Sequence, residues 1–158
     1  MHFRPARVEE ADELTELAVR ATRSGGYDDE ALARMRPGLQ ANLDLISAGV
    51  LFVAEEESGR LVGWVALRPL QFPGVVLLED VFIEPELQQR GAGKQLFQFA
   101  VERARRFPAR VVLVFANPFA DGFYDGLGFM RLGKVPYAYL PGTELTMFAY
   151  TVPEPTVG

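Results

Sequence analysis

Short apolar runs bounded by turn residues alternate along this chain with longer segments in which apolar residues recur at helical spacing. The helical spacing predicts one helix over about 11–21, a broken helical stretch that ends near Ser47 and is interrupted by Pro37, and a further helix that starts after Gly91. The apolar runs predict buried or half-buried strands. These strands are expected over residues 3–7, 50–55, 61–70, 77–83, 111–116, 130–135 and 145–152.

The order of the predicted elements is strand, helix, helix, three strands, helix, strand, helix and two strands. Turn residues at Glu57-Ser58-Gly59 and Phe72-Pro73-Gly74 indicate hairpins early in the chain, whereas the later strands are joined through helices. This combination predicts a single α/β domain whose sheet contains both antiparallel and parallel pairing. We assign the domain to residues 1–152 and expect residues 153–158 to form a flexible tail.

Composition narrows the classes of site that the chain can build. Its 158 residues and 49% hydrophobic content allow a sizeable core, and the absence of cysteine excludes disulfides, thiolate zinc sites and a cysteine nucleophile. The single histidine, His2, supports neither a Ser-His-Asp triad nor a His-rich metal site, so we expect no metal. No apolar window is long enough for a membrane span and the start is unlike a signal peptide. We therefore expect a cytoplasmic protein without a membrane partner.

The charge pattern gives a weaker signal than the motifs described below. The formal net charge is −5, from 21 acidic and 16 basic residues, and no Lys/Arg block resembles a nucleic-acid-binding patch. We expect no nucleic-acid partner and attribute the acidity to solubility. A second interpretation is that Asp28, Asp29 and Glu30 attract a cationic ligand.

The segment 88–94, Gln-Gln-Arg-Gly-Ala-Gly-Lys, joins the strand over 77–83 to the amphipathic helix that follows. The first N–H groups of a helix have no acceptors within the helix, and the helix dipole favours an anion there. Gly91 and Gly93 also lack the side chains that would block a close approach. The segment therefore predicts a phosphate-binding site.

Two common nucleotide-binding patterns do not match this loop. A Walker A loop would need Gly in place of Gln88 and Ser or Thr in place of Gln95. A dinucleotide fingerprint built on Gly91 and Gly93 would need a third Gly in place of Leu96. What remains is the pattern Gln-x-x-Gly-x-Gly after a strand.

A second motif, Asn-Pro-Phe-Ala-Asp-Gly-Phe-Tyr-Asp-Gly-Leu-Gly-Phe, occupies residues 117–129 directly after the strand over 111–116. Together the two motifs resemble the GNAT superfamily of N-acetyltransferases. Its acyl-CoA loop reads Arg or Gln, two residues, Gly, one residue, and Gly or Ala. Its later segment reads Asn-x-x-Ala-x-x-Phe-Tyr-x-x-x-Gly-Phe, and all six fixed positions are present here. Two departures are Ala92, where a larger residue is common, and the helix-weakening glycines Gly122 and Gly126.

The resemblance implies a mixed, mostly antiparallel sheet of six or seven strands flanked by about four helices, with a splayed parallel strand pair at the cofactor site. It implies acetyl-CoA as the cofactor, with the pantetheine arm held by the strand before the loop and the pyrophosphate held by the loop. Asn117 would bond near the pantetheine, although Pro118 after it also fits a helix N-cap. The cofactor-binding residues implied in this way are Val81, Phe82, Ile83, Gln88, Gln89, Arg90, Gly91, Ala92, Gly93, Lys94, Asn117 and Tyr124.

The implied reaction is transfer of an acetyl group from acetyl-CoA to a primary amine by direct attack in a ternary complex. Tyr124 stands at the position of the family's general acid, and a phenol with a pKa near ~10 is well matched to a thiol near ~8.5. The alternative is that Tyr124 is an amphipathic aromatic that packs its ring.

A base is useful because freeing the lone pair of an alkyl ammonium at neutral pH costs about 4–5 kcal/mol. The Leu-Glu-Asp run before the loop resembles the polyamine-acetyltransferase branch, in which the Glu position acts as base through water. This implies that Glu79 is the base and that Asp80 is structural. Adjacent strand residues face opposite sides, so we expect only one of them to face the acceptor cleft. The alternative is that both carboxylates bond to loops and take no part in catalysis.

The acceptor is the least determined component. By analogy, its walls come from the loop at residues 25–27, the strand around Trp64 and the loop at residues 137–139, which assigns acceptor contacts to Tyr27, Trp64, Tyr137 and Tyr139. A small-molecule amine and a protein or peptide amine both remain candidates, and a homodimer is possible within the family. A catalytically silent acyl-CoA-binding module is the alternative function, and the presence of Tyr124 and Glu79 argues against it. A purely structural domain leaves the phosphate loop unexplained.

Overall fold

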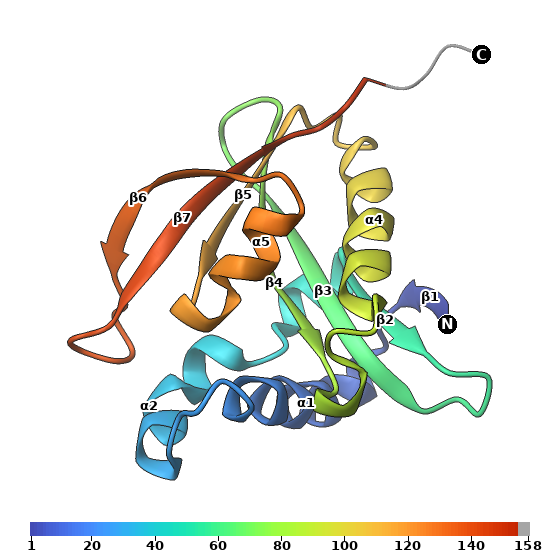
Figure 1. Cartoon of the computed structure of the whole chain (residues 1–158). Coiled ribbons are helices and arrows are strands. Elements are labelled where there is room, and N and C mark those ends of the chain that lie inside the picture. Colours follow the sequence, from blue (N-terminus) through green and yellow to red (C-terminus); the bar gives the residue numbers. More distant parts are fainter. Residues whose placement is uncertain (155–158) are drawn as a thin grey trace.

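A computed structural model describes residues 1–154, apart from the side chain of Asp80. Within the described residues, one seven-stranded sheet runs through the middle of the protein in the order β1-β2-β3-β4-β5-β7-β6 (Figure 1). Neighbouring strands pair in antiparallel fashion except β4 and β5, which pair in parallel. The strands are β1 (His2–Pro5), β2 (Leu51–Glu55), β3 (Leu61–Pro69), β4 (Val75–Ile83), β5 (Val111–Ala116), β6 (Met130–Pro136) and β7 (Glu144–Thr151).

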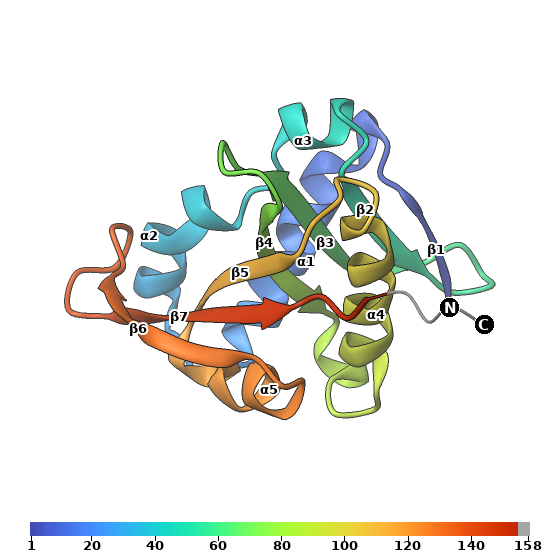
Figure 2. The same cartoon turned by 90° about the horizontal axis from the view of Figure 1, so that it is seen from above.

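Helices cover both faces of this sheet (Figure 2). One face is packed by α1 (Ala11–Arg23), α2 (Asp29–Leu39) and α3 (Leu43–Ser47), and the other by α4 (Ala92–Ala104) and α5 (Asp121–Gly126). Three short 3-10 turns lie ahead of helices in the described chain: η1 (Val8–Glu10) before α1, η2 (Pro85–Leu87) before the loop that leads to α4, and η3 (Pro118–Ala120) before α5. None of the helices in the described part of the chain is long and apolar enough to cross a membrane.

Strand β2 shows how the sheet divides the core into two layers. Leu51 and Val53 belong to the cluster on the α1–α3 side, whereas Phe52 and Ala54 belong to the cluster on the α4–α5 side. This alternation follows from the two-residue period of a strand, and all four side chains are buried. A strand that is apolar at successive positions is therefore explained by burial on both faces.

The observed elements confirm the predicted mixed α/β sheet, with one difference around Pro37. The proline does not break the helical stretch but lies inside α2, near its C-terminal end, where a lost helical hydrogen bond disrupts little that follows. The break comes at residues 40–42, and the side chain of Asn42 accepts hydrogen bonds from Asp44 and Leu45 to start α3. Of the predicted tail, residues 155–158 lie outside the described residues, and the assignment of a domain to 1–152 stays a prediction.

The parallel pair β4–β5 opens partway along its length. Pairing joins Val75–Leu78 to Val111–Val114, but β4 continues to Ile83 and β5 to Ala116. Beyond Leu78 the two strands separate. This is the splayed pair that the family resemblance implies, and it places a gap in the centre of the sheet.

A β-bulge in β4 lies where this gap begins. Leu78 pairs with Leu67 and Val81 pairs with Val65, so two residues of β4 lie opposite Ala66 of β3. Leu78 and Val81 consequently point to the same face although they are three positions apart. The bulge lies at Glu79 and Asp80 and interrupts the regular alternation of side chains there. Alternation along β4 therefore does not decide whether only one of these two carboxylates faces the cleft.

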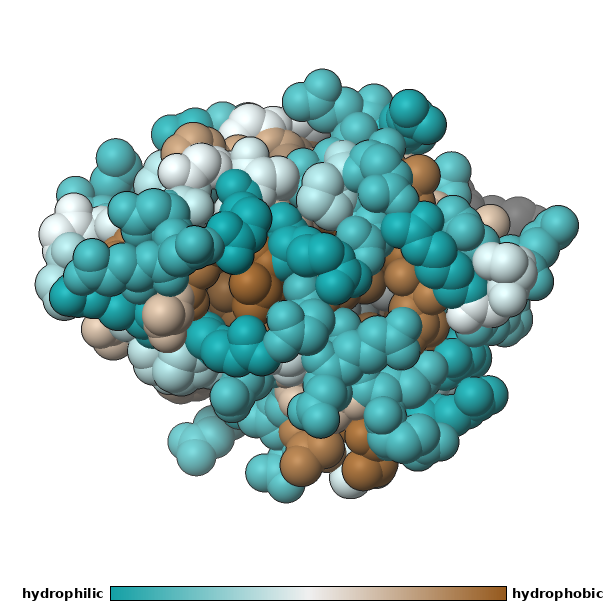
Figure 3. Space-filling view, turned by 90° about the horizontal axis from the view of Figure 1, so that it is seen from below, coloured by the Kyte–Doolittle hydropathy of each residue, from teal (hydrophilic) through white to brown (hydrophobic). Residues whose placement is uncertain are grey.

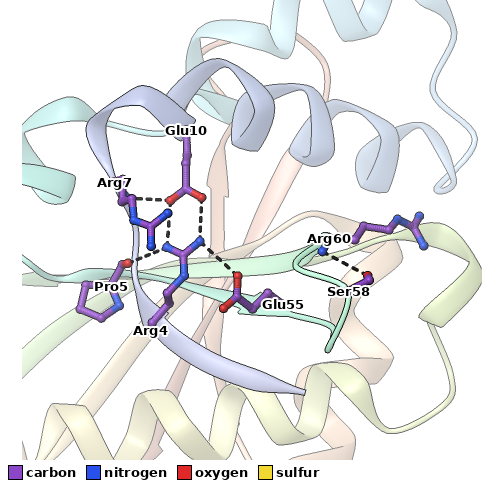
Figure 4. Close-up of polar contacts among 7 residues, drawn as sticks. All are labelled: Arg4, Pro5, Arg7, Glu10, Glu55, Ser58 and Arg60. Atoms are coloured by element: carbon purple, nitrogen blue, oxygen red, sulfur yellow. Dashed lines mark hydrogen bonds and ion pairs between the residues drawn. The ribbon is translucent and has the colours of Figure 1, made fainter.

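The N-terminal strand is joined to the sheet by a cluster of charged groups around Arg4 (Figure 4). The Arg4 guanidinium bonds the carboxylate of Glu10 in η1 at 2.8 Å and that of Glu55 in β2 at 3.2 Å. Glu10 also accepts a hydrogen bond from the backbone N–H of Arg7 at 2.8 Å. The hydrogen bond from the Arg4 guanidinium, followed by that from the Arg7 N–H, lowers the pKa of Glu10. The cluster fixes the point at which the chain leaves β1 and enters α1.

Candidate active site

A large groove with a volume of about 770 Å³ lies along the open part of β4 and reaches the N-terminus of α4. On the side of the molecule shown in Figure 3, apolar surface lies in recesses between hydrophilic residues. Arg90, Ala92 and Tyr124, which the family resemblance also assigned to the cofactor, are not among the residues that line the groove. The predicted cofactor-binding residues that do line it are Val81, Phe82, Ile83, Gln88, Gln89, Gly91, Gly93, Lys94 and Asn117.

The loop before α4 has a backbone conformation suited to an anion. Gln89 has a φ of 64° and Gly91 a φ of 84°, so the chain enters the left-handed region twice within three residues. Such alternation turns successive N–H groups toward one concave surface. No described side chain caps the N-terminus of α4, and the cationic side chains of Arg90 and Lys94 are exposed beside it. The helix dipole, the N–H groups and the two cations all favour bound phosphate.

The two glycines of this loop are required for different reasons. Gly91 adopts a left-handed conformation that strains other residues, while a Cβ at this position would meet no atom within 4 Å. A Cβ on Gly93 would lie 2.9 Å from Cε1 of Phe123, so Gly93 permits α4 to pack against α5. The structure thus adds a packing role to the close approach that the sequence predicted for both glycines.

Contacts with the ends of α1 and β4 hold the loop in place. Gln88 donates from Nε2 to the carbonyl of Ile83 at 3.1 Å, and its Oε1 accepts a hydrogen bond from the Ser24 hydroxyl at 3.2 Å. Glu84, only 4% exposed, forms an ion pair with Arg20 of α1. Gln88 is therefore a structural part of the loop as well as a groove residue. No pattern in the sequence pointed to Arg20, Ser24 or Glu84.

Two buried polar atoms in the groove wall have no hydrogen-bond partner among the described residues: the hydroxyl of Tyr27 and Oδ1 of Asn117. Burial raises the pKa of the Tyr27 phenol. The Tyr27 ring packs edge-on against Phe119, with ring centroids 5.3 Å apart, and so connects the α1–α2 loop to η3. Since unsatisfied buried polar groups are costly, both atoms are suited to bonding a ligand.

Tyr124, the predicted general acid, is completely buried. Its ring packs against Phe123, Phe129 and Phe148, with centroid separations of 5.1, 5.2 and 5.6 Å. Phe123, the residue before it in α5, lines the groove. Tyr124 thus belongs to the aromatic cluster on the α4–α5 side of the sheet. This placement suits the packing interpretation at least as well as the catalytic one.

A small cavity with a volume of about 330 Å³ lies next to the groove, on the α2 side of β3 and β4. Glu79 lines it, and Oε1 of Glu79 accepts a hydrogen bond from Nε of Arg68 at 2.7 Å. Trp64, Tyr137 and Tyr139 line it too, whereas Tyr27 lines the large groove; that these four residues contact the acceptor stays a prediction. The indole N–H of Trp64 donates to the carbonyl of Leu14 at 2.8 Å, so this nitrogen serves the fold.

The end of α2 and the β6–β7 hairpin meet at the mouth of the small cavity. A Cβ on Gly38 would lie 2.8 Å from Cδ2 of Tyr139 and 2.9 Å from the Tyr137 hydroxyl. The two tyrosine rings are themselves edge-on, 5.7 Å apart. Gly38 therefore permits the loop that carries Tyr137 and Tyr139 to pack against α2. No sequence motif around Gly38 indicated this role.

Phe82 and Asn117 line both the groove and the cavity. Phe82 belongs to the open part of β4, and Asn117 follows the last residue of β5. The two spaces therefore meet where β4 and β5 separate. A ligand in the groove and a second molecule in the cavity would therefore come closest to each other at Phe82 and Asn117.

Arg68 is the principal cavity residue that sequence reasoning missed. A signal for it existed, because β3 and β4 were predicted to form a hairpin: β3 carries one charged residue in an apolar run, Arg68, and β4 carries the adjacent carboxylates Glu79 and Asp80. With the register Arg68 opposite Leu77, the charges of Arg68 and Glu79 come close. Phe115 and the residues at the end of α2 had no comparable signal, since their approach depends on tertiary packing.

Comparison with known proteins identifies the family. The model of the acetyltransferase (GNAT) family matches residues 11–129, which is more than half of the chain. No curated protein matches the chain significantly.

Several solved structures share the fold at low sequence identity. One is an aminoglycoside 6'-N-acetyltransferase complexed with coenzyme A, with a TM-score of 0.72, 15% identity, and coverage of 99% of this chain and 100% of that one. A second is the PaiA N-acetyltransferase of Thermoplasma acidophilum in complex with coenzyme A, with a TM-score of 0.74, 17% identity, and coverage of 95% and 98%. A third is YncA of Salmonella typhimurium with its cofactor acetyl-CoA, with a TM-score of 0.69, 20% identity, and coverage of 100% and 97%. The family match, together with this shared fold, shows that the chain belongs to the acetyltransferase (GNAT) family and is an acetyltransferase.

Proposed function

We propose that the protein transfers an acetyl group from acetyl-CoA to a small primary amine by direct attack within a ternary complex. The observation that carries this proposal is that a groove ending at a helix N-terminus and a separate cavity share two wall residues, Phe82 and Asn117. The groove fits a long phosphorylated donor and the cavity fits a small acceptor. Solved relatives of this fold hold coenzyme A or acetyl-CoA.

The residues of the groove fit this donor. Its loop presents left-handed backbone at Gln89 and Gly91 next to Arg90 and Lys94, which suits a pyrophosphate. The unpartnered Asn117 Oδ1 suits an amide N–H of a pantetheine arm lying in the gap. The backbone of Val81–Ile83 extends beyond the part of β4 that pairs with β5, which supports its proposed role in holding the same arm. When bound, acetyl-CoA supplies a thioester carbonyl as the electrophile and a thiolate as the leaving group.

The proposed reaction forms one bond and breaks one. The amine nitrogen bonds the thioester carbonyl carbon while the carbon–sulfur bond breaks; the amine loses a proton and the sulfur gains one, giving an acetamide and free coenzyme A. Glu79 is the proposed base, through water. It lines the cavity, and its hydrogen bond from Arg68 fixes the orientation of its carboxylate.

Tyr124 is the proposed acid for the leaving sulfur. Its position after Phe123, which lines the groove, supports this role, and its complete burial supports the competing role in packing. A catalytically silent acyl-CoA-binding module is the alternative function. A cytoplasmic location and a homodimer stay predictions.

One experiment tests the function and the base together. Acetyl-CoA is titrated into the protein, and a panel of amines is then assayed for release of free thiol. The proposal expects binding and amine-dependent release, whereas binding without release by any amine favours the silent module. For the base, the pH dependence of kcat/KM is compared between the wild type and Glu79→Gln. We expect the variant to lose the acidic limb of the profile, and an unaltered profile would remove Glu79 from the mechanism.

A further inference from the structure

The charges in the small cavity limit which amines it can accept. Among its described lining residues the charged side chains are Arg68 and Glu79, which are opposite in sign and paired. A polyamine or another polycation needs an excess of carboxylates, and here it would also meet the Arg68 guanidinium.

The acidic residues at the start of α2 do not supply that excess. Asp28 caps the helix by accepting from the Ala31 N–H at 2.8 Å. Asp29 pairs with Arg23, and Glu30 pairs with Arg34 at 3.2 Å. None of the three lines the small cavity. The sequence interpretation that they attract a cationic ligand therefore has no support from the cavity.

The Arg68–Glu79 pair can exchange partners with a ligand. The two side chains are 43% and 30% exposed, and ion pairs at this level of exposure are weak. A molecule that carries both an ammonium and a carboxylate would bond Glu79 with the first and Arg68 with the second. Each wall charge then keeps an opposite charge beside it, so the exchange leaves no charge unpaired.

The spacing within the pair indicates how far apart the two ligand charges must be. Nε of Arg68 lies 2.7 Å from Oε1 of Glu79, so ligand groups that bond both side chains are close neighbours. An amine and a carboxylate separated by one or two carbon atoms meet this requirement. Groups at opposite ends of a long chain do not.

The rest of the cavity wall combines apolar and aromatic side chains with polar ones. Trp64, Leu78, Phe82, Phe115 and Leu145 line it, and so do Gln40, Asn42 and Asn117. Its volume of about 330 Å³ is at the lower end of the range for ligand pockets. That space suits a single small molecule better than a folded peptide or a large antibiotic.

We propose that the acceptor is a small α- or β-amino acid, whose carboxylate bonds Arg68 and whose amine faces Glu79. This inference rests on the proposed acetyl transfer and specifies its acceptor. It makes Arg68 the residue that selects the acceptor, while Glu79 keeps the role of base.

The test compares leucine with two analogues that lack the carboxylate, leucine amide and 3-methylbutylamine, in the thiol-release assay with saturating acetyl-CoA. Leucine amide loses its ammonium proton more readily than leucine, and 3-methylbutylamine less readily. A preference for leucine over both therefore reports the carboxylate and not the basicity of the amine. We expect kcat/KM for leucine to exceed that for either analogue at least ten-fold, which is roughly the discrimination that one charge-assisted hydrogen bond supplies.

Variants identify the selecting residue. Arg68→Gln should raise KM for leucine about ten-fold, with little change in the KM for the two analogues or in acetyl-CoA affinity. Its kcat should fall alike for all three amines, because Glu79 loses the hydrogen bond that orients it. Arg68→Lys should recover part of the loss in KM. Arg34→Gln is the matched control, because Arg34 also forms an exposed ion pair but lies outside the cavity. It should leave every KM unchanged.

The outcomes separate this inference from the function on which it rests. Equal turnover of leucine and leucine amide, or a preference for spermidine, would overturn the amino-acid acceptor and leave acetyl transfer standing. Absence of acetyl-CoA binding and of release with every amine would overturn the acetyl transfer and this inference together. A loss for leucine that is the same in Arg34→Gln would remove Arg68 as the selecting residue.

Discussion

The large groove and the small cavity meet at Phe82 and Asn117 but are built in different ways. The end of the groove at α4 depends on backbone conformation in one continuous segment, the loop before α4, while α1 and the loop after it, β4, η3 and α5 supply the rest of its lining. The cavity depends on side chains brought together from α2, β3, β4, β5 and the β6–β7 hairpin. A local segment carries its conformation in its own residues, whereas a wall made from many segments is set by tertiary packing. Substitutions should therefore affect the two spaces separately.

The largest effect is expected from Tyr124→Phe, in the buried aromatic cluster next to the groove residue Phe123. Phenylalanine keeps the ring contacts with Phe123, Phe129 and Phe148 and removes only the hydroxyl. If Tyr124 is the acid, kcat falls roughly 100- to 1,000-fold while acetyl-CoA affinity and Tm stay nearly constant. Steady-state kinetics and a thermal melt measure both. An unchanged kcat would assign Tyr124 to packing alone.

On the groove side, Gly91→Val should weaken acetyl-CoA binding roughly 10- to 100-fold, since a displaced loop misplaces the N–H groups that meet phosphate. Valine is strained at the φ of 84° that Gly91 adopts. Gly59→Val is the matched control, because Gly59 has a φ of 89° in the β2–β3 turn, away from the groove. Isothermal titration should show the affinity loss in the first variant only. A similar loss in both would mean that general destabilisation is the cause.

On the cavity side, Gly38→Ala should raise KM for the amine about three- to ten-fold and leave the acetyl-CoA Kd unchanged. The added Cβ would lie within 3 Å of Tyr137 and of Tyr139, so the loop that carries these two residues must move outward. Gly126→Ala, which adds a methyl group in open space on α5, provides the comparison and should not change the amine KM. A change in acetyl-CoA affinity with Gly38→Ala would show that the two spaces are coupled.

The smallest functional effect is expected from Glu10→Gln, which is remote from both spaces. It should lower the free energy of unfolding by about 1–2 kcal/mol at pH 7, because it removes the charged partner of Arg4. The pKa of Glu10 is lowered in the folded state, so its contribution is present above the unfolded pKa and is lost as pH falls through the folded pKa. The difference from the wild type should therefore close progressively below about pH 4.

Urea melts at several pH values measure this difference in stability. Glu13→Gln, an exposed position in the first turn of α1, serves as the control. A difference that persists unchanged at pH 2 would contradict the linkage. Altered KM values in Glu10→Gln at neutral pH would contradict the separation of the fold from the two spaces.

The sequence predicted the sheet, most element boundaries and the groove loop, because each depends on short-range patterns. Apolar runs marked the strands, and Gly91 marked the left-handed start of α4. The bulge in β4 was not predictable from alternation, since β4 is apolar on both sides of Glu79 and Asp80. The partner of Glu79, Arg68, required the register of the β3–β4 hairpin. The placement of Tyr27 in the groove required the packing of its ring on Phe119.

The four-residue pairing of β4 with β5 has a mechanical consequence. Strands β1–β4 and β5–β7 form two half-sheets, and Val75–Leu78 against Val111–Val114 is the backbone seam between them. Beyond this seam, toward Ile83 and Ala116, the half-sheets are free of mutual backbone pairing. A molecule lying in that gap would contact both half-sheets and restrict their movement relative to each other. Occupancy of the groove would then stiffen the whole sheet, and the enzyme would be most rigid when it holds its donor.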